Sequence, residues 1–261
     1  MSTSLLSVEG LHKSFGGVVA AGHVTFALEA GTLLAIIGPN GAGKSTIFNM
    51  LGGQLAPDRG RVLLCGQNIT GLAPRRIWRL GVGRTFQVAQ TFVSMTVAEN
   101  VQMALISHHH RTRAWWPGAA GLYRAQALGL LERVGMSADA DRPSSELAYG
   151  DVKRVELAIA LAGAPKLLLM DEPTAGMGAT ERAQLMQLVK DIARASGLGV
   201  LFTEHDMDAV FRHADQIVVL VRGEVAAAGR PAQVRANRRV QEVYLGHGGA
   251  TALERGSRPA P

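Results

Sequence analysis

The sequence predicts an α/β fold in which helices cover a mixed β-sheet. Two continuous apolar runs, Leu33–Ile37 and Leu167–Met170, are typical of strands that are buried on both faces. Segments with helical spacing alternate with strands along most of the chain. The first strands instead follow one another across glycine turns, which indicates an antiparallel entry sub-sheet. A stretch of helical spacing in mid-chain predicts an inserted α-helical sub-domain.

The composition fits one large domain. The chain has 261 residues, of which 47% are hydrophobic, so it can bury a sizeable core. Its single cysteine, Cys65, cannot form an internal disulfide, which fits a reducing compartment, and apolar neighbours predict that Cys65 is a small buried strand residue. The N-terminus lacks the pattern of a signal peptide, and no apolar run approaches the roughly 20 residues that span a bilayer. We therefore expect any membrane association to come through a partner.

The net charge is +6 and the sequence pI is about 10.0. A basic chain can bind nucleic acid or anionic lipid headgroups. The arginines are scattered along the chain rather than gathered in one stripe. We expect a generally basic surface and no nucleic-acid partner.

Hydrophobic periodicity and turn residues predict the bounds of the strands and helices. The expected strands are Leu5–Val8, Val24–Leu28, Leu33–Ile37, Arg61–Cys65, Gly83–Phe86, Leu167–Met170, Val200–Thr203, Gln216–Val221 and Glu224–Ala228. The expected helices are a helix that opens at Ile47, Pro74–Leu80, Val97–Ile106, Tyr123–Val134, Val152–Gly163, Ala179–Ala195 and Met207–His213, with one or two more near the end. One domain is expected over residues 6–246, with the helical insertion at about 88–163 and a disordered tail at 247–261.

An irregular loop is expected inside the insertion. It contains three adjacent histidines, His108–His110, and the pair Trp115 and Trp116. Adjacent histidines point in different directions and have no cysteine or carboxylate nearby in sequence, so we interpret them as part of a solvated loop rather than a metal site. The two tryptophans either pack this loop or contact a partner.

A glycine-rich segment joins the strand Leu33–Ile37 to the helix that follows it. Its glycines let successive backbone amides turn toward phosphate oxygens, and the helix N-terminus adds a partial positive charge. Lys44 is placed to reach the β and γ phosphates, and Ser45 to offer a hydroxyl to Mg²⁺. A chance glycine turn is the alternative, but the strand–loop–helix context is that of a P-loop NTPase core. The expected nucleotide-binding residues are Gly38, Pro39, Asn40, Gly41, Ala42, Gly43, Lys44, Ser45 and Thr46.

Two acids follow the second apolar run. Asp171 lies at the end of a buried strand, where it can hold magnesium through a bound water, and Glu172 is placed to polarise an attacking water. A simple strand-end turn is the alternative for two adjacent carboxylates. Because a P-loop magnesium site needs a strand-end acid, we interpret the pair as catalytic.

In combination these motifs resemble the nucleotide-binding subunits of ATP-binding cassette (ABC) transporters, over nearly the whole chain from Leu6 to Gly246. The resemblance implies that Phe15 stacks on adenine, a contact worth about 1–3 kcal/mol for a base on an aromatic ring. It implies that Gln87 in Thr85–Gln87 reaches magnesium and couples to a membrane partner. It also implies that His205 is the switch histidine that contacts the γ phosphate, and that Ala175–Gly178 is the D-loop.

The segment Leu147–Asp151 resembles the family's signature motif, which faces the P-loop of a second subunit. Ala148 and Gly150 would then contact ATP from another chain. The segment departs from the commonest form of the motif, since Ala148 replaces a serine that would cap the helix and Asp151 replaces a glutamine. Gly150 and the free helix amides remain to bind phosphate. The resemblance implies an ATP-driven clamp of two ATPase subunits.

The segment Thr203–Phe211, the ending Val243–Gly246 and Tyr149 look most like the ATPase subunits of bacterial branched-chain amino acid importers. That group implies two multi-span membrane permeases, a second ATPase subunit and, indirectly, a periplasmic solute-binding protein. It implies a peripheral location at the cytoplasmic face of the inner or plasma membrane. Urea or amide importers and the lipopolysaccharide exporter have similar ATPases and stay open as alternatives.

Two further classes stay open. A soluble ABC protein that acts on nucleic acid or ribosomes would usually carry two cassettes or a long coiled-coil insertion, and neither is visible. A regulatory module that binds ATP without hydrolysing it is suggested by the altered signature segment. That second class predicts that Glu172→Gln changes nothing measurable.

Overall fold

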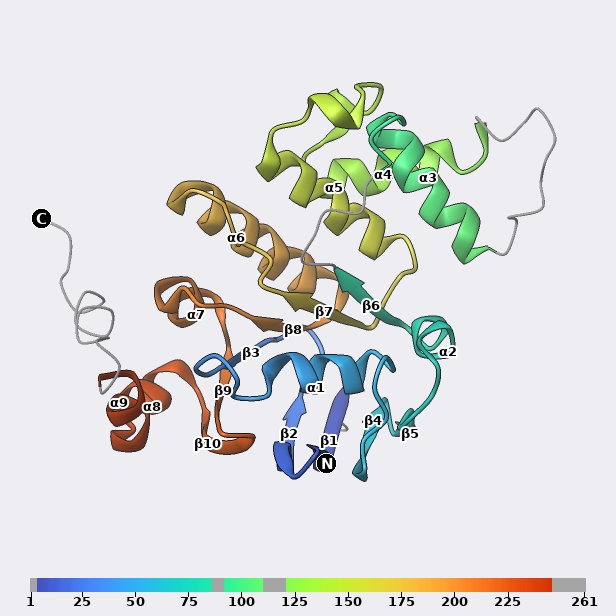
Figure 1. Cartoon of the computed structure of the whole chain (residues 1–261). Coiled ribbons are helices and arrows are strands. Elements are labelled where there is room, and N and C mark those ends of the chain that lie inside the picture. The colour runs from blue at the N-terminus through green and yellow to red at the C-terminus, as the bar shows by residue number, and fades with distance from the viewer. Residues whose placement is uncertain (1–3, 86–91, 110–120, 246–261) are drawn as a thin grey trace, which may run out of the picture.

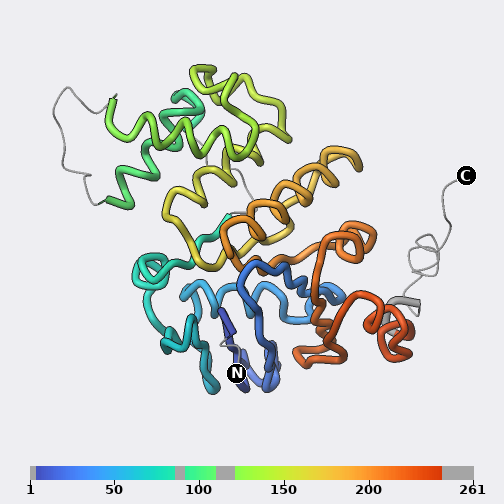
Figure 2. Tube along the Cα trace, turned by 180° about the vertical axis from the view of Figure 1, so that it is seen from behind, coloured from blue at the N-terminus to red at the C-terminus, as the bar shows by residue number. Residues whose placement is uncertain are grey.

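The structure, a computed structural model, describes residues 4–85, 92–109 and 121–245. The expectations for Gln87, His110, Trp115, Trp116 and the tail 247–261 lie outside these residues. The described chain forms two sheets with helices around them, and one group of helices extends to one side of the larger sheet in both views (Figures 1 and 2). The predicted α/β class with a mixed sheet, an antiparallel sub-sheet and an inserted helical sub-domain is confirmed.

The smaller sheet is antiparallel and has the order β2-β1-β4-β5. Its strands are β1 (Leu6–Phe15), β2 (Val18–Leu28), β4 (Arg59–Leu64) and β5 (Gln67–Asn68). The first two are much longer than predicted. Register shifts after Val8 and Leu11 break the in-out alternation, so the sequence pattern stops where the strand bends but continues.

The larger sheet has six strands in the order β10-β9-β3-β8-β7-β6. They are β3 (Leu33–Ile37), β6 (Val82–Thr85), β7 (Leu167–Asp171), β8 (Gly199–Thr203), β9 (Gln216–Val221) and β10 (Glu224–Gly229). All neighbours are parallel except β9 and β10. The expectation that Leu33–Ile37 continues the antiparallel entry was wrong. This strand lies inside the larger sheet, parallel to β8 and β9, because it is apolar on both faces.

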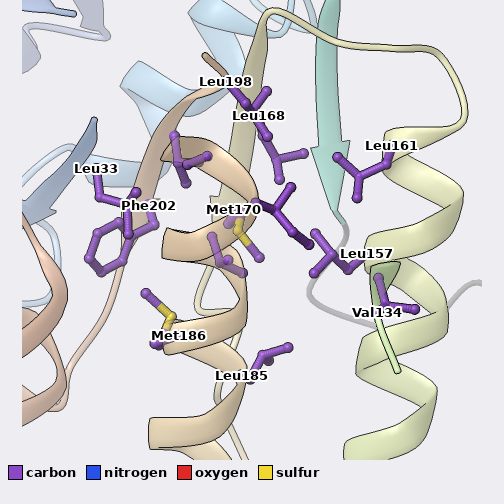
Figure 3. Packing of buried hydrophobic residues seen from close by; sticks show 14 of the residues in the cluster. Leu33, Val134, Leu157, Leu161, Leu168, Met170, Leu185, Met186, Leu198 and Phe202 are labelled. Carbon is purple, nitrogen blue, oxygen red and sulfur yellow. The ribbon is translucent and has the colours of Figure 1, made fainter. Parts of the chain in front are cut away.

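Alternate residues of β3 enter two different cores. Leu33, Ala35 and Ile37 join a core shared with α3–α6, whereas Leu34 and Ile36 join one shared with α1 and the smaller sheet. Figure 3 shows Leu168 and Met170 of β7 between side chains of two helices in the first core. Burying each such side chain contributes about 1.5–3 kcal/mol, so the central strands are held firmly from both sides. Their carboxyl ends therefore form a rigid edge.

The helices are α1 (Lys44–Leu51), α2 (Pro74–Arg79), α3 (Val97–His108), α4 (Arg124–Arg133), α5 (Tyr149–Leu161), α6 (Ala179–Ser196), α7 (Met207–His213), α8 (Pro231–Ala236) and α9 (Arg238–Leu245). Helices α3, α4 and α5 pack on one another beyond the β6 edge of the larger sheet (Figure 1). In the described ranges, every helix is too short or too polar to cross a bilayer.

Two local expectations were wrong. Cys65 is exposed and has a φ of 49°, because β4 ends at Leu64 and Cys65 begins the turn into β5. His108 belongs to α3 and meets the Trp78 ring edge-on with centroids 5.4 Å apart, while His109 stacks on Tyr123 at 4.5 Å. His108 is therefore a packing residue of a helix rather than part of a solvated loop, whereas His109 is exposed in the turn that follows α3. No cluster of metal-ligating side chains is found among the described residues.

Candidate active site

The glycine-rich segment forms a tight loop between β3 and α1. Gly43 precedes the helix with a φ of 101°, and a Cβ placed on it would lie 2.1 Å from the carbonyl oxygen of Ala20. A Cβ on Gly38 would lie 2.3 Å from the carbonyl oxygen of Leu220. Only glycine fits at these two positions, because β2 and β9 approach the loop backbone so closely. Contacts with β2 and β9 thus fix the backbone conformation of the loop.

Lys44 is nearly buried, with 8% of its surface exposed. Its Nζ donates to the carbonyl oxygens of Gly38 at 2.6 Å and Pro39 at 3.2 Å. Burial lowers the pKa of Lys44 below its ordinary value, and the negative charges of Glu172 and Asp171 oppose that change. The ammonium is therefore held inside the loop, facing the two acids.

The two predicted acids stand at the end of β7. Oε1 of Glu172 lies 2.8 Å from Nε2 of His205, whose side chain is 52% exposed. The backbone of Glu172 has a φ of 49°, which a non-glycine residue rarely adopts. Its N–H donates to the carbonyl oxygen of Thr203 at 3.2 Å and to Oγ1 of Thr203 at 3.1 Å. The end of β8 thus fixes the turn that aims Glu172 at His205.

A cavity of about 220 Å³ brings these motifs together. It is lined by Ala20, by the loop residues Asn40–Thr46, and by Glu172 and His205. A carboxylate and an imidazole therefore face backbone amides, a helix N-terminus and an ammonium across one polar space. Such a space suits a chain of phosphates, with Glu172 beside it as a general base.

The residues that would hold Mg²⁺ fit that ion. Ser45 is exposed and lines the cavity, and Asp171 ends β7 beside Glu172. One oxygen of Asp171 accepts from Oγ1 of Thr203 at 2.6 Å, and the other lies 3.9 Å from Nη2 of Arg84. Mg²⁺ takes one or two oxygen ligands from protein and the rest from water and phosphate, so a hydroxyl with one carboxylate is a suitable donor set.

Six of the described predicted residues do not line this cavity: Gly38, Pro39, Asp171, Phe15, Ala148 and Gly150. Gly38 and Pro39 hold Nζ of Lys44 through their carbonyl oxygens, and Asp171 lies beside Glu172 at the end of β7. Phe15 ends β1 with half of its surface exposed, and Nζ of Lys13 lies 5.6 Å from the centre of its ring. Ala148 and Gly150 begin α5, in the helical group that stands away from α1 (Figure 1). Ala148 is the N-cap of α5 and makes no capping side-chain bond, as its lack of a hydroxyl predicts. Gln87 lies outside the described residues.

The sequence reasoning missed three contributors. Ala20 approaches the loop from β2, Arg84 reaches Asn49 of α1 with both Nη atoms at 3.1 Å, and Thr203 supports both acids. Burial lowers the pKa of Arg84, and the charge of Asp171 opposes this. Each lies on a different strand from the motif that it supports, so only the position of Thr203 directly before Glu204–His205 offered a signal.

Comparison with known proteins identifies two families in the chain. Residues 21–175 match the family described as ABC transporter, and residues 224–250 match the family described as branched-chain amino acid ATP-binding cassette transporter. The chain is 39% identical over 255 residues to the high-affinity branched-chain amino acid transport ATP-binding protein LivG of Escherichia coli, covering 94% of this chain and 99% of that one. It is 37% identical over 258 residues to the corresponding protein BraF of Pseudomonas aeruginosa, with the same coverage.

Solved structures agree with these matches. A crystal structure of the ADP conformation of an ATP-binding cassette of an ABC transporter has a TM-score of 0.84 and 32% identity, over 94% of this chain and all of that chain. A dimeric post-hydrolysis cassette bound to ADP and phosphate has a TM-score of 0.71 and 26% identity, over 87% of this chain and 98% of that one.

Proposed function

We propose that this chain, which belongs to the family of ABC transporter ATP-binding subunits, is the ATP-hydrolysing subunit of a branched-chain amino acid importer. Relatives named as high-affinity branched-chain amino acid transport ATP-binding proteins align over 94% of the chain. The observation that carries the ATPase activity is the Glu172–His205 pair across one cavity from Lys44 and the glycine-rich loop.

The residues divide the chemistry among them. The loop amides and Lys44 bind the β and γ phosphates, and Phe15 stacks on adenine outside the cavity. Glu172 accepts a proton from the attacking water, and His205 holds that carboxylate at 2.8 Å while contacting the γ phosphate. Ser45, Asp171 and Gln87 would hold Mg²⁺, which would neutralise charge on the phosphates.

A second ATPase chain completes the site. Gly150 and Ala148 are too far from the cavity of their own chain to line it, and α5 presents free N-terminal amides that suit a phosphate. We expect these amides to contact ATP bound to a partner subunit; a similar cassette bound to ADP and phosphate is dimeric. ATP binding would then close two subunits against two membrane permeases, at the cytoplasmic face of the membrane. A solute-binding protein would deliver the substrate on the other side.

The test replaces Glu172 in the chain and follows both activity and transport. Purified Glu172→Gln is expected to hydrolyse ATP at least about 100-fold more slowly than wild type, because a general base contributes roughly 10²–10⁴. In a host that lacks the gene, uptake of radiolabelled leucine is expected to fall. Wild type should restore that uptake and Glu172→Gln should not.

Other results of these uptake and ATPase measurements would support a different function. Loss of urea uptake with normal leucine uptake would assign the chain to an amide importer, and loss of lipopolysaccharide export would assign it to an exporter. Equal ATPase rates for wild type and Glu172→Gln would contradict the catalytic role and favour a regulatory module. Stimulation of the ATPase by DNA, lost at moderate salt, would indicate a soluble nucleic-acid protein.

A further inference from the structure

We infer that Thr174 and Glu204 form a buried clasp that positions the pair Glu172 and His205 for ATP hydrolysis. Thr174 lies two residues after Glu172, and Glu204 lies directly before His205. The clasp therefore joins the two loops that carry the pair. This inference rests on the proposed function, since it takes Glu172 and His205 as the residues that act on ATP.

The contacts are short and shielded from water. Thr174 is 2% exposed and Glu204 is 5% exposed. Oε1 of Glu204 accepts from the backbone N–H of Thr174 at 2.9 Å and from its Oγ1 at 2.6 Å. Oε2 of Glu204 accepts from the backbone N–H of His205 at 3.3 Å. One carboxylate thus ties both loops together, and charge-assisted bonds of this kind are the stronger ones.

The clasp lies beside a strained backbone position, Glu172. Glu172 has a φ of 49°, a conformation that persists only where surrounding contacts impose it. Oγ1 of Thr203 accepts a hydrogen bond from the N–H of Glu172, and the carbonyl oxygen of Glu172 accepts one from the N–H of Ala175 at 3.1 Å. Thr174 lies inside this turn. Without its bonds to Glu204 the turn is free to relax, and the carboxylate of Glu172 would then leave its place 2.8 Å from His205.

The clasp acts through other residues and not on the substrate. The phosphate cavity is lined by Glu172 and His205 but by neither Thr174 nor Glu204. Arg182 makes a second tie near it, because this side chain pairs with Asp206 and also donates to the carbonyl oxygen of Met177 at 3.2 Å. Thr174 and Glu204 are therefore positioning residues, and their loss should affect the turnover rate more than ATP binding.

The experiment measures steady-state ATP hydrolysis by the full chain carrying Thr174→Val. Valine keeps the shape of threonine and the backbone N–H but removes the 2.6 Å bond. We expect kcat to fall by about 10- to 100-fold, because a displacement of about 1 Å in a catalytic group can cost about 100-fold. KM for ATP should change less than about twofold, because the glycine-rich loop is untouched. Thr174→Ser keeps both bonds and should restore kcat.

Thr70→Val is the matched control. Oγ1 of Thr70 accepts from the N–H of Val62 at 2.8 Å and donates to Oδ1 of Asn68 at 2.6 Å, in the smaller sheet. This variant also removes a 2.6 Å hydroxyl bond, at residues that do not line the phosphate cavity, so it should lower thermal stability and leave kcat unchanged. If Thr174→Val does not fold, Glu204→Gln takes its place. It keeps an acceptor for Thr174 but sets an NH₂ group against the N–H of His205, so kcat should still fall at constant KM.

A normal kcat in Thr174→Val, or in Glu204→Gln if that variant replaces it, would overturn the inference. So would a loss that Thr174→Ser does not restore, or a fall in kcat that Thr70→Val reproduces, since these outcomes describe a structural bond only. Glu172→Gln separates this failure from a failure of the proposed function. If Glu172→Gln stops hydrolysis while Thr174→Val is normal, only the clasp is wrong. If Glu172→Gln hydrolyses ATP normally, the proposed function fails.

Discussion

Lys44 illustrates how single residues of this site depend on one another. Its ammonium is buried against two carbonyl oxygens of its own loop, and burial disfavours a charge. Glu172 and Asp171 face it and partly offset that cost. The acids that serve hydrolysis therefore also support the cation that binds phosphate. Replacing Glu172 or Asp171 with a neutral residue would therefore change the electrostatic environment of Lys44.

His213 is a second buried ionisable residue, away from the cavity. It ends α7 with 3% of its surface exposed, and neither ring nitrogen has a hydrogen-bond partner among the described residues. Burial lowers the pKa of His213, and the positive charges of Lys190 and Arg212 lower it further. Protonation is therefore harder in the folded chain than in the unfolded chain.

This residue predicts a pH dependence of stability. Above the unfolded-state pKa of about 6.5 the imidazole is neutral in both states, so it adds no pH dependence to the free energy of unfolding. As the pH falls below that value the unfolded chain binds a proton that the folded chain resists, so the free energy of unfolding decreases. Thermal unfolding between pH 8 and 5 should show this loss, and His213→Leu should reduce it. An equal pH dependence in His213→Leu would contradict the prediction, and the exposed His109→Gln is the control.

At the scale of elements, two helices of the insertion begin differently. Helix α3 starts with a capping box, in which Oγ1 of Thr96 accepts from the N–H of Glu99 and the Glu99 side chain accepts from the N–H of Thr96. Helix α5 starts at Ala148, which has no side-chain oxygen. The first amides of α5 are thus left without a side-chain cap at its N-terminus, where the proposed partner nucleotide binds.

A hydroxyl at this position should stabilise the helix. Ala148→Ser is expected to raise the free energy of unfolding by about 1 kcal/mol. For a chain of this size that corresponds to an increase in Tm of about 2–4 °C. Thermal unfolding followed by circular dichroism measures it, with Ala148→Val as the control that adds volume without an acceptor. A Tm of Ala148→Ser equal to that of wild type would show that the α5 start is satisfied in another way.

At the scale of the whole molecule, the two parts of the proposed ATP site, the phosphate cavity and the start of α5, lie at different places on the chain. The phosphate cavity lies at the ends of β3, β7 and β8, whereas Gly150 lies on the separate helical group (Figure 1). One chain does not bring them together. Two chains arranged head to tail would pair each cavity with the other chain's α5, so association and ATP binding become linked.

Blocked hydrolysis should therefore reveal a dimer. Glu172→Gln with ATP and Mg²⁺ is expected to have about twice the mass of the 27.6 kDa chain in light scattering coupled to size exclusion. The same protein without ATP should be a monomer. Lys44→Ala should stay monomeric in ATP, because it loses the ammonium that binds phosphate. If Glu172→Gln binds ATP and remains a monomer, the clamp needs a different partner chain or does not exist.

Much of this arrangement could be predicted from local patterns. Strand β3 and the loop to Lys44 were predictable because apolar continuity, glycines and a helix start lie next to one another in the chain. The place of β3 in the sheet was not, because strand pairing depends on β8 and β9 more than 160 residues away. The prediction that Cys65 is a buried strand residue was wrong for a related reason. The end of β4 is set by its pairing with β5 and not by apolar neighbours.

The sequence by itself determined the nature of the site: a phosphate-binding loop, two strand-end acids, a histidine after another strand and a helix start without a hydroxyl. These are contiguous motifs whose chemistry follows from residue type and spacing. Only the tertiary structure decided that Glu172 meets His205, that Thr203 supports both acids and that Thr174 is tied to Glu204. Those contacts join β7 and β8, which become neighbours only when the larger sheet forms.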